Sequence, residues 1–186
     1  MTERSQMPPM EKSDEANLEQ LQFARMQGDA YKEALSFMAN EEADDGGETR
    51  AGDYLVAYAV EHAEGMYALE GGELKWHNPE DANAHIEISV RDAADNRFIP
   101  GLDITVAVDD AQGERVGEHI QPFLWHPWLF HYGRNWILPT DGEYTLHVHI
   151  KAPPFMRHDR LNGKRYSKDV DVEFRKVKIS TGRKVS

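Results

Sequence analysis

The chain has 186 residues, a net charge of −12 and no cysteine. This length suits one domain with an appendage, because single hydrophobic cores are usually built from about 100–150 residues. So acidic a surface repels phosphate backbones and anionic lipids, which makes nucleic acid and membranes poor partners, but it attracts cations. Without cysteine there are no disulfides, thiolate sites or thiol nucleophiles, so any metal must be held by His, Met, Asp or Glu.

Residues 1–12 are polar, include Pro8 and Pro9, and are predicted to form a disordered tip. They contain no apolar stretch of the kind found in a signal peptide. As written, the sequence indicates no export, although a processed form would look the same. The localisation therefore stays open.

Residues 13–40 are predicted to form an amphipathic helix or helix pair that starts at Ser13 or Asp14, which suit an N-cap. Gly28 and Asp29 leave open whether there is one helix or two. The stripe is too apolar for a free helix in water, so it must be buried on its own sandwich or across a dimer, and we favour the dimer. Its residues are Leu18, Leu21, Phe23, Met26, Tyr31, Ala34, Leu35 and Met38.

Residues 41–52 are predicted to be an acidic linker, because EEADDGGE carries no apolar residue larger than alanine. From residue 53 the apolar period becomes two, with turn signals between short segments and no helical segment among them. This pattern predicts a mainly β protein, an immunoglobulin-like antiparallel β-sandwich over 53–180, followed by a tail, 181–186. The expected strands are 53–63, 65–70, 84–92, 102–110, 114–120, 135–138, 143–152 and 170–179.

The segment AHIEISV places His85 and Glu87 on one face of a strand, with isoleucines and a valine on the other. An imidazole and a carboxylate together suit a divalent metal. The alternative is that both simply face solvent. HVHI has the same spacing, but we assign His147 and His149 a structural or surface role.

The segment FLWHPWLFHYGRN, 123–135, surrounds His126 and His131 with aromatic residues. Pro127 and Gly133 predict a shaped loop around HPWLFHYG. Trp125, Trp128 and Trp136 are expected to form an apolar wall. Either His131 is hydrogen-bonded within that wall, or it belongs to a site.

A third segment, PPFMRHDRLNGKR, is predicted to be a polar loop that carries Met156, His158 and Asp159. Loops on a rigid sandwich are common places for binding residues. This loop therefore joins the two histidine segments as a candidate part of one site.

HYGRN, the DGEYTLHVHI strand, APP, the RHD loop and the VDVEF strand together resemble the periplasmic ferrous-iron transport protein family. The resemblance covers about residues 53–180 and leaves out the N-terminal helix. It implies an immunoglobulin-like, usually dimeric protein that binds copper and iron and accompanies a high-affinity iron permease. AHIEISV resembles the H-x-E strand of that family.

By this resemblance, the metal ligands fall on His85, His131 and His158, with Glu87 as the nearby carboxylate. The family has a methionine several residues before the HYG histidine, whereas residues 122–126 here contain none. Either His126 takes the vacant role, or the site is degenerate. Loss of a thioether weakens a preference for Cu(I) and leaves Cu(II), Fe(II) or Zn(II) as candidate metals.

The sequence thus predicts a non-catalytic protein that binds iron or copper, with zinc possible, acts as a homodimer and has an iron permease as a candidate partner. One alternative is an interaction module with structural histidines, whose helix docks a partner. A third is a small metalloenzyme with an open coordination position. The sequence has no motif for a nucleophile or a general base, such as GxSxG or HExxH.

Overall fold

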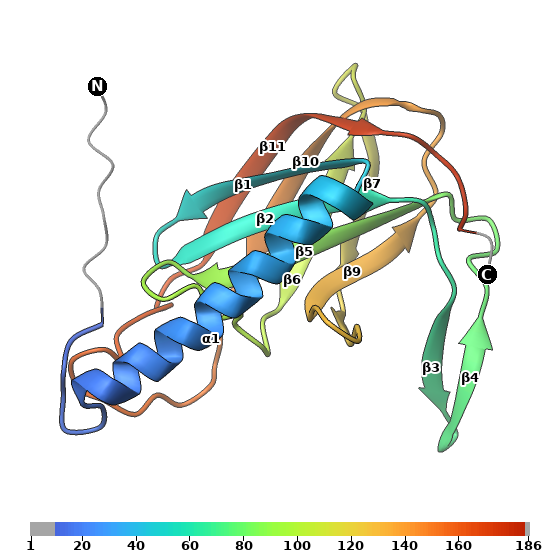
Figure 1. The fold of residues 1–186 in the computed structure, drawn as a ribbon. Coiled ribbons are helices and arrows are strands. Elements are labelled where there is room, and N and C mark those ends of the chain that lie inside the picture. Colours follow the sequence, from blue (N-terminus) through green and yellow to red (C-terminus); the bar gives the residue numbers. More distant parts are fainter. Residues whose placement is uncertain (1–9, 185–186) are drawn as a thin grey trace.

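The structure, a computed structural model, describes residues 10–184. One helix, one π-helical turn and a series of short strands follow one another along the chain (Figure 1). The elements are α1 (Leu18–Phe37), η1 (Met38–Glu42), β1 (Asp45–Ala51), β2 (Tyr54–Glu61), β3 (Met66–Glu70), β4 (Glu73–His77), β5 (Ala84–Asp92), β6 (Ile104–Asp109), β7 (Arg115–Ile120), β8 (Phe123–Leu124), β9 (His131–Trp136), β10 (Gly142–Ile150) and β11 (Val170–Ile179).

Two antiparallel sheets form the sandwich and confirm the predicted fold class. One has the strand order β1-β2-β5-β9-β8 and the other β11-β10-β6-β7. Their inner faces are lined by alternating apolar residues, such as Ile86 and Ile88 of β5 and Leu146 and Val148 of β10, all of them buried. This period-two pattern gives each sheet one face for the core.

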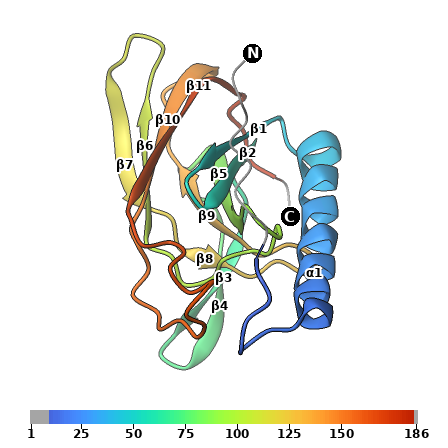
Figure 2. The ribbon, with the colours of Figure 1, turned by 90° about the vertical axis from the view of Figure 1, so that its left-hand side faces the viewer.

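Helix α1 forms a third layer on the outer face of the five-stranded sheet (Figure 2). Tyr31 and Leu35 pack there, with Met38 of η1, against Ala57 and Leu129 of the sandwich. The stripe is therefore covered by its own sandwich, the alternative that we did not favour. Part of it stays exposed, namely Leu18, Phe23 and Met26.

Helix α1 is continuous and begins at Leu18, later than predicted. Asn17 is the N-cap and forms a capping box with Gln20, whereas the Ser13 hydroxyl donates to Asp159 in the loop after β10. Gly28 does not break the helix. It is buried where the helix touches the turn after β5, and an added Cβ would lie 1.8 Å from the carbonyl oxygen of Asp95.

Several segments differ from the prediction. Most of the expected linker 41–52 is η1 and the edge strand β1, because the backbone of 45–51 pairs with β2 although its side chains are small or polar. The HYG residues are not in a loop but begin β9, where pairing with β5 fixes the backbone. A two-stranded hairpin, β3–β4, extends away from the sandwich (Figure 1).

The two ends of the chain also pack against the sandwich within the described range. Of the predicted tip 1–12, residues 1–9 lie outside the described residues, while the backbone of Glu11 bonds to the side chain of Asn162. Of the predicted tail, Arg183 forms a β-bridge with Ala63, and residues 185–186 lie outside the described residues. Across residues 10–184, the one long helix is too polar to cross a membrane.

Candidate metal site

The outer face of β5 carries a row of polar side chains that is buried. His85 has 0% exposure, Glu87 6% and Ser89 3%. The alternative in which His85 and Glu87 face solvent is wrong, because α1 and the loop before β9 cover this face of the sheet. Tyr31 of α1 completes the cover, since its hydroxyl lies 3.1 Å from the Ser89 hydroxyl and donates to the carbonyl of Phe130.

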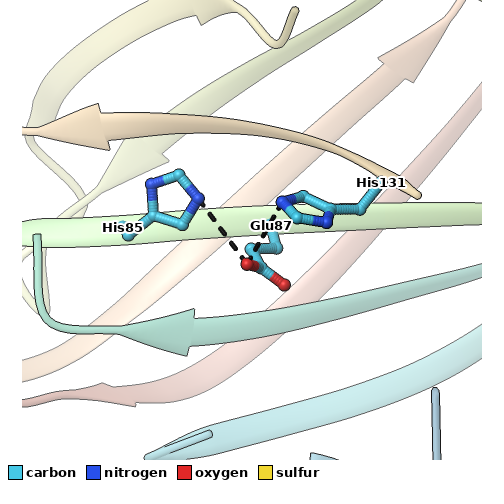
Figure 3. A group of neighbouring side chains, drawn as sticks. All are labelled: His85, Glu87 and His131. Carbon is cyan, nitrogen blue, oxygen red and sulfur yellow. Dashed lines mark ion pairs between the residues drawn. The ribbon is translucent and has the colours of Figure 1, made fainter. Parts of the chain in front are cut away.

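His85, Glu87 and His131 form one compact group, with donor atoms within 4.8 Å of one another. Oε1 of Glu87 lies 3.6 Å from Nε2 of His85 and 3.2 Å from Nε2 of His131. Figure 3 shows the two rings on either side of the carboxylate, both directed at the same oxygen. Two ligand atoms of one metal ion are at most about 4.4 Å apart, because the bonds are about 2.0–2.2 Å long. Both distances to Glu87 fit that limit.

The other ring nitrogen of each histidine is held by a neighbour. Nδ1 of His85 lies 2.9 Å from Oδ1 of Asn135, and Nδ1 of His131 lies 3.2 Å from the carbonyl oxygen of Leu129. Because both partners are acceptors, Nδ1 carries the proton and Nε2 keeps its lone pair. Both Nε2 atoms are buried without a hydrogen-bond partner. A histidine that ligates a metal has a protonated Nδ1 and a free lone pair on Nε2 in the same way, and Asn135 is placed to orient His85.

Burial favours the neutral forms of all three groups. Burial lowers the pKa of His85, and burial followed by the nearby His85 lowers the pKa of His131 to about 4, so both rings are neutral at pH 7. Burial, and then the charges of Glu61 and Glu64, raise the pKa of Glu87 well above its ordinary value. A bound cation would remove these penalties by offering the carboxylate an opposite charge.

A pocket of about 240 Å³ leads to the group. Its apolar lining includes Phe37, Met38 and Trp128, from the end of α1, η1 and the loop before β9. Its charged lining includes the carboxylates of Glu42, Glu61 and Glu64 and the ammonium of Lys184. The excess of acidic residues favours a cation in this pocket.

His126 lies beside the group and outside it. Its ring centroid is 6.2 Å from that of His131, it lines the same pocket, and its Nδ1 is buried without a hydrogen-bond partner.

His158 is not brought to the group within one chain. It is 91% exposed, and its nearest charged partner is Glu15, just before α1. The pocket lies at the other end of α1, and a 20-residue helix is about 30 Å long. The loop that carries His158 lies at the N-terminal end of the helix (Figure 1).

Some residues around the group were not predicted from the sequence. Asn135, Glu61 and Lys184 come from three segments whose register and docking a single sequence does not give, since Asn135 and Glu61 face His85 only through the pairing of β9 and β2 with β5. The aromatic wall is also smaller than expected. Trp136 is buried, but Trp125 is 71% and Trp128 44% exposed.

These features define a β-sandwich protein with a buried two-histidine, one-carboxylate group, a donor set suited to a divalent transition metal. A family model for "Fe2+ transport protein" matches residues 33–179, which is more than half of the chain. The chain therefore belongs to the Fe2+ transport protein family. No curated protein matches it.

Solved structures share the fold. FetP of uropathogenic E. coli strain F11 is 22% identical, with 73% of this chain and 93% of FetP covered and a TM-score of 0.59. A copper-bound variant of FetP is 20% identical, with 72% and 95% covered and a TM-score of 0.60. Copper-reconstituted P19 of Campylobacter jejuni is 16% identical, with 74% and 96% covered and a TM-score of 0.62.

Proposed function

We propose that the protein binds divalent iron or copper through His85, Glu87 and His131 and carries it in iron uptake, as a binding protein and not as an enzyme. The main support is the pair of buried, unpartnered Nε2 atoms on either side of one buried carboxylate. Leaving such atoms unpaired is costly unless a ligand joins them. Membership of a transport family and the copper-bound FetP structure agree with this role.

The donor set determines which metals we propose. Two imidazoles and a carboxylate suit Cu(II), Fe(II) and Zn(II). Two further side chains line the pocket and are candidates for the missing methionine of the family pattern, His126 and Met38. If the thioether of Met38 joins the site, Cu(I) becomes a further cargo; if His126 does, the site stays a nitrogen–oxygen site.

Metal binding is tested on protein purified without a metal-affinity column. Elemental analysis gives the metal retained, and competition with a chelator gives the affinity for Cu(II), Zn(II) and, without oxygen, Fe(II). We expect His85→Asn, Glu87→Gln and His131→Asn each to weaken binding by at least about 100-fold, the upper end of the range for residues that only support a ligand. His77→Asn, on the exposed hairpin, is the matched control. Equal affinities in all four variants would contradict the proposal and favour an interaction module.

We also propose that the protein acts as a homodimer and that His158 of the partner subunit completes the site. Support comes from the high exposure of His158 on its own chain, from its distance from the pocket along α1, and from the exposed apolar residues of the helix. Sedimentation equilibrium tests the dimer. A monomer whose metal affinity is unchanged by His158→Ala would contradict both parts.

The proposed recipient is a high-affinity iron permease, as the family resemblance implies. Co-purification of the two proteins, with and without metal, tests this transfer. The absence of any complex in both conditions would contradict it.

A further inference from the structure

The candidate metal group already has a positive charge beside it, carried by the C-terminal segment. The ammonium of Lys184 contacts Glu61 and lies 3.0 Å from Oε2 of Glu64. The other oxygen of Glu64 lies 3.8 Å from Nε2 of His85. One carboxylate thus connects the lysine to a proposed metal ligand.

The position of Lys184 is set by a short stretch of backbone. The amide of Ala63 donates to the carbonyl of Gly182, and the amide of Lys184 donates to the carbonyl of Ala63. Gly182 passes close to the ring of His62, where an added Cβ would lie 2.8 Å from a ring carbon. The amide of Gly182 also donates to the carbonyl of Asn83, and the guanidinium of Arg183 donates to the carbonyl of Ala82. These few bonds lie at the end of the chain, where local opening does not require the sandwich to unfold.

Charge makes Lys184 and a metal ion competitors. Four acidic residues, Glu42, Glu61, Glu64 and Glu87, line the pocket. Lys184 lowers the electrostatic cost of holding Glu61, Glu64 and Glu87 together. A divalent cation at the histidines would satisfy the same carboxylates and repel the ammonium. The family model matches residues 33–179, so Lys184 lies outside the matched segment.

We propose that Lys184 competes with the metal ion from within the chain. In the metal-free protein its ammonium takes the place of a metal ion between Glu61 and Glu64. A bound divalent ion displaces this ammonium together with the C-terminal segment. The inference rests on the proposed function. Its consequence is a weaker but more readily reversible site, as a protein that passes its cargo on requires.

The first test compares chelator-competition affinities for Cu(II) and Zn(II). We expect Lys184→Gln to bind each metal about tenfold more tightly than the wild type, because the competing charge is gone. Lys184→Arg keeps the charge and should bind like the wild type. Lys168→Gln, an exposed lysine near the opposite end of the strands, is the matched control for loss of charge. A purely structural lysine predicts the reverse, weaker binding in Lys184→Gln.

The second test follows the release of the lysine itself. The acetylation rate of Lys184 in the full-length wild type, measured by mass spectrometry against Lys168, should rise when Zn(II) is added. If the wild type binds metal but Lys184→Gln binds it no more tightly, the inference is overturned and the proposed function stands. The same holds if Zn(II) leaves the acetylation rate of Lys184 unchanged. No metal binding by either protein would overturn the proposed function itself, and the inference with it.

Discussion

Gly133 leaves the space in which the two histidine rings of the candidate metal site lie. It pairs with Glu87 across β9 and β5, and a Cβ added there would lie 2.9 Å from Nε2 of His85 and 3.2 Å from Cδ2 of His131. Its backbone is that of an ordinary strand residue, so what the position requires is room and not unusual dihedral angles. The site thus depends on a missing side chain as well as on those present.

We expect Gly133→Ala to weaken Cu(II) and Zn(II) binding by about 10- to 100-fold, the range for residues that position a ligand. The added methyl group would push His85 and His131 apart while β9 stays in the sheet. Chelator competition measures the affinity, and circular dichroism checks the fold. Gly142→Ala, where an added Cβ meets nothing within 4 Å, is the control. Unchanged affinity in Gly133→Ala would show that the rings do not need this space.

The buried His131 should make the metal-free protein sensitive to acid. Its folded-state pKa of about 4 lies below the ordinary 6.5, so the unfolded chain binds a proton that the folded chain excludes. This destabilises the fold as the pH falls from about 6.5 to about 4, by on the order of 3 kcal/mol. The raised pKa of Glu87 acts in the opposite sense, since its contribution falls as the pH rises.

Urea unfolding of metal-free protein at several pH values between 7 and 4 measures this effect. In His131→Gln the free energy of unfolding should fall less over that range, by about 3 kcal/mol. The exposed-site variant His77→Gln should follow the wild type. Parallel curves for wild type and His131→Gln would contradict the assignment.

At the residue scale, the spacing of His85 and Glu87 predicted that both side chains lie on one face of a strand, because the alternation of side chains along a strand depends only on local backbone geometry. The aromatic surroundings of His131 made it a candidate with a structural role as the alternative, and the family resemblance then assigned it as a metal ligand. Asn135 and Glu61 were not predicted, because the register of β9 and β2 against β5 depends on the whole sheet. His158 was assigned by resemblance alone, and one chain does not carry it to the site.

At the scale of elements, helix α1 covers the outer face of β5, so that this face is both polar and buried. Its buried residues are Gly28 and Leu35, which lie about two helical turns apart. The buried Met38 of η1 follows about one turn later. The apolar stripe predicted a buried helix but not its partner, because amphipathicity does not say which surface covers the helix. β1 was missed because its residues are small or polar, and only its pairing with β2 makes it a strand.

Substitution of Gly28 tests how closely α1 packs against the sandwich. Alanine usually stabilises a helix by about 1 kcal/mol relative to glycine, but here its Cβ would clash with the Asp95 carbonyl. We expect Gly28→Ala to lower the free energy of unfolding by about 2 kcal/mol. Chemical denaturation measures it, with the exposed Lys32→Ala as control. A more stable Gly28→Ala would mean that the helix does not sit so close.

At the scale of the whole molecule, three layers bring distant segments to one pocket. The sandwich could be predicted because short alternating strands without crossover helices favour it. The third layer and the docked C-terminal segment could not, because both depend on tertiary contacts such as those of Leu35 with Leu129 and of Ala63 with Arg183, which no local pattern encodes. The candidate site lies where these unpredicted parts meet the predicted sandwich.

Removal of residues 1–43 tests this arrangement and spares β1. We expect a folded sandwich whose free energy of unfolding is lower by several kcal/mol, because the sheet face with Ala57 and Leu129 loses its apolar cover. Calorimetry measures the stability, and sedimentation shows whether the uncovered face makes the protein associate. Unchanged stability would mean that the helix contributes nothing to the fold.

The docked C-terminal segment also decides how the protein can be labelled. A polyhistidine tag after Ser186 would begin three residues beyond Lys184, whose ammonium lies 3.0 Å from Glu64 at the pocket. Its imidazoles would be within reach of any ion held there and would add a second chelator to every titration. A tag before Met1 would be attached through the end of α1 that is about 30 Å from the pocket. Fluorophores and surface anchors are best attached at the same end.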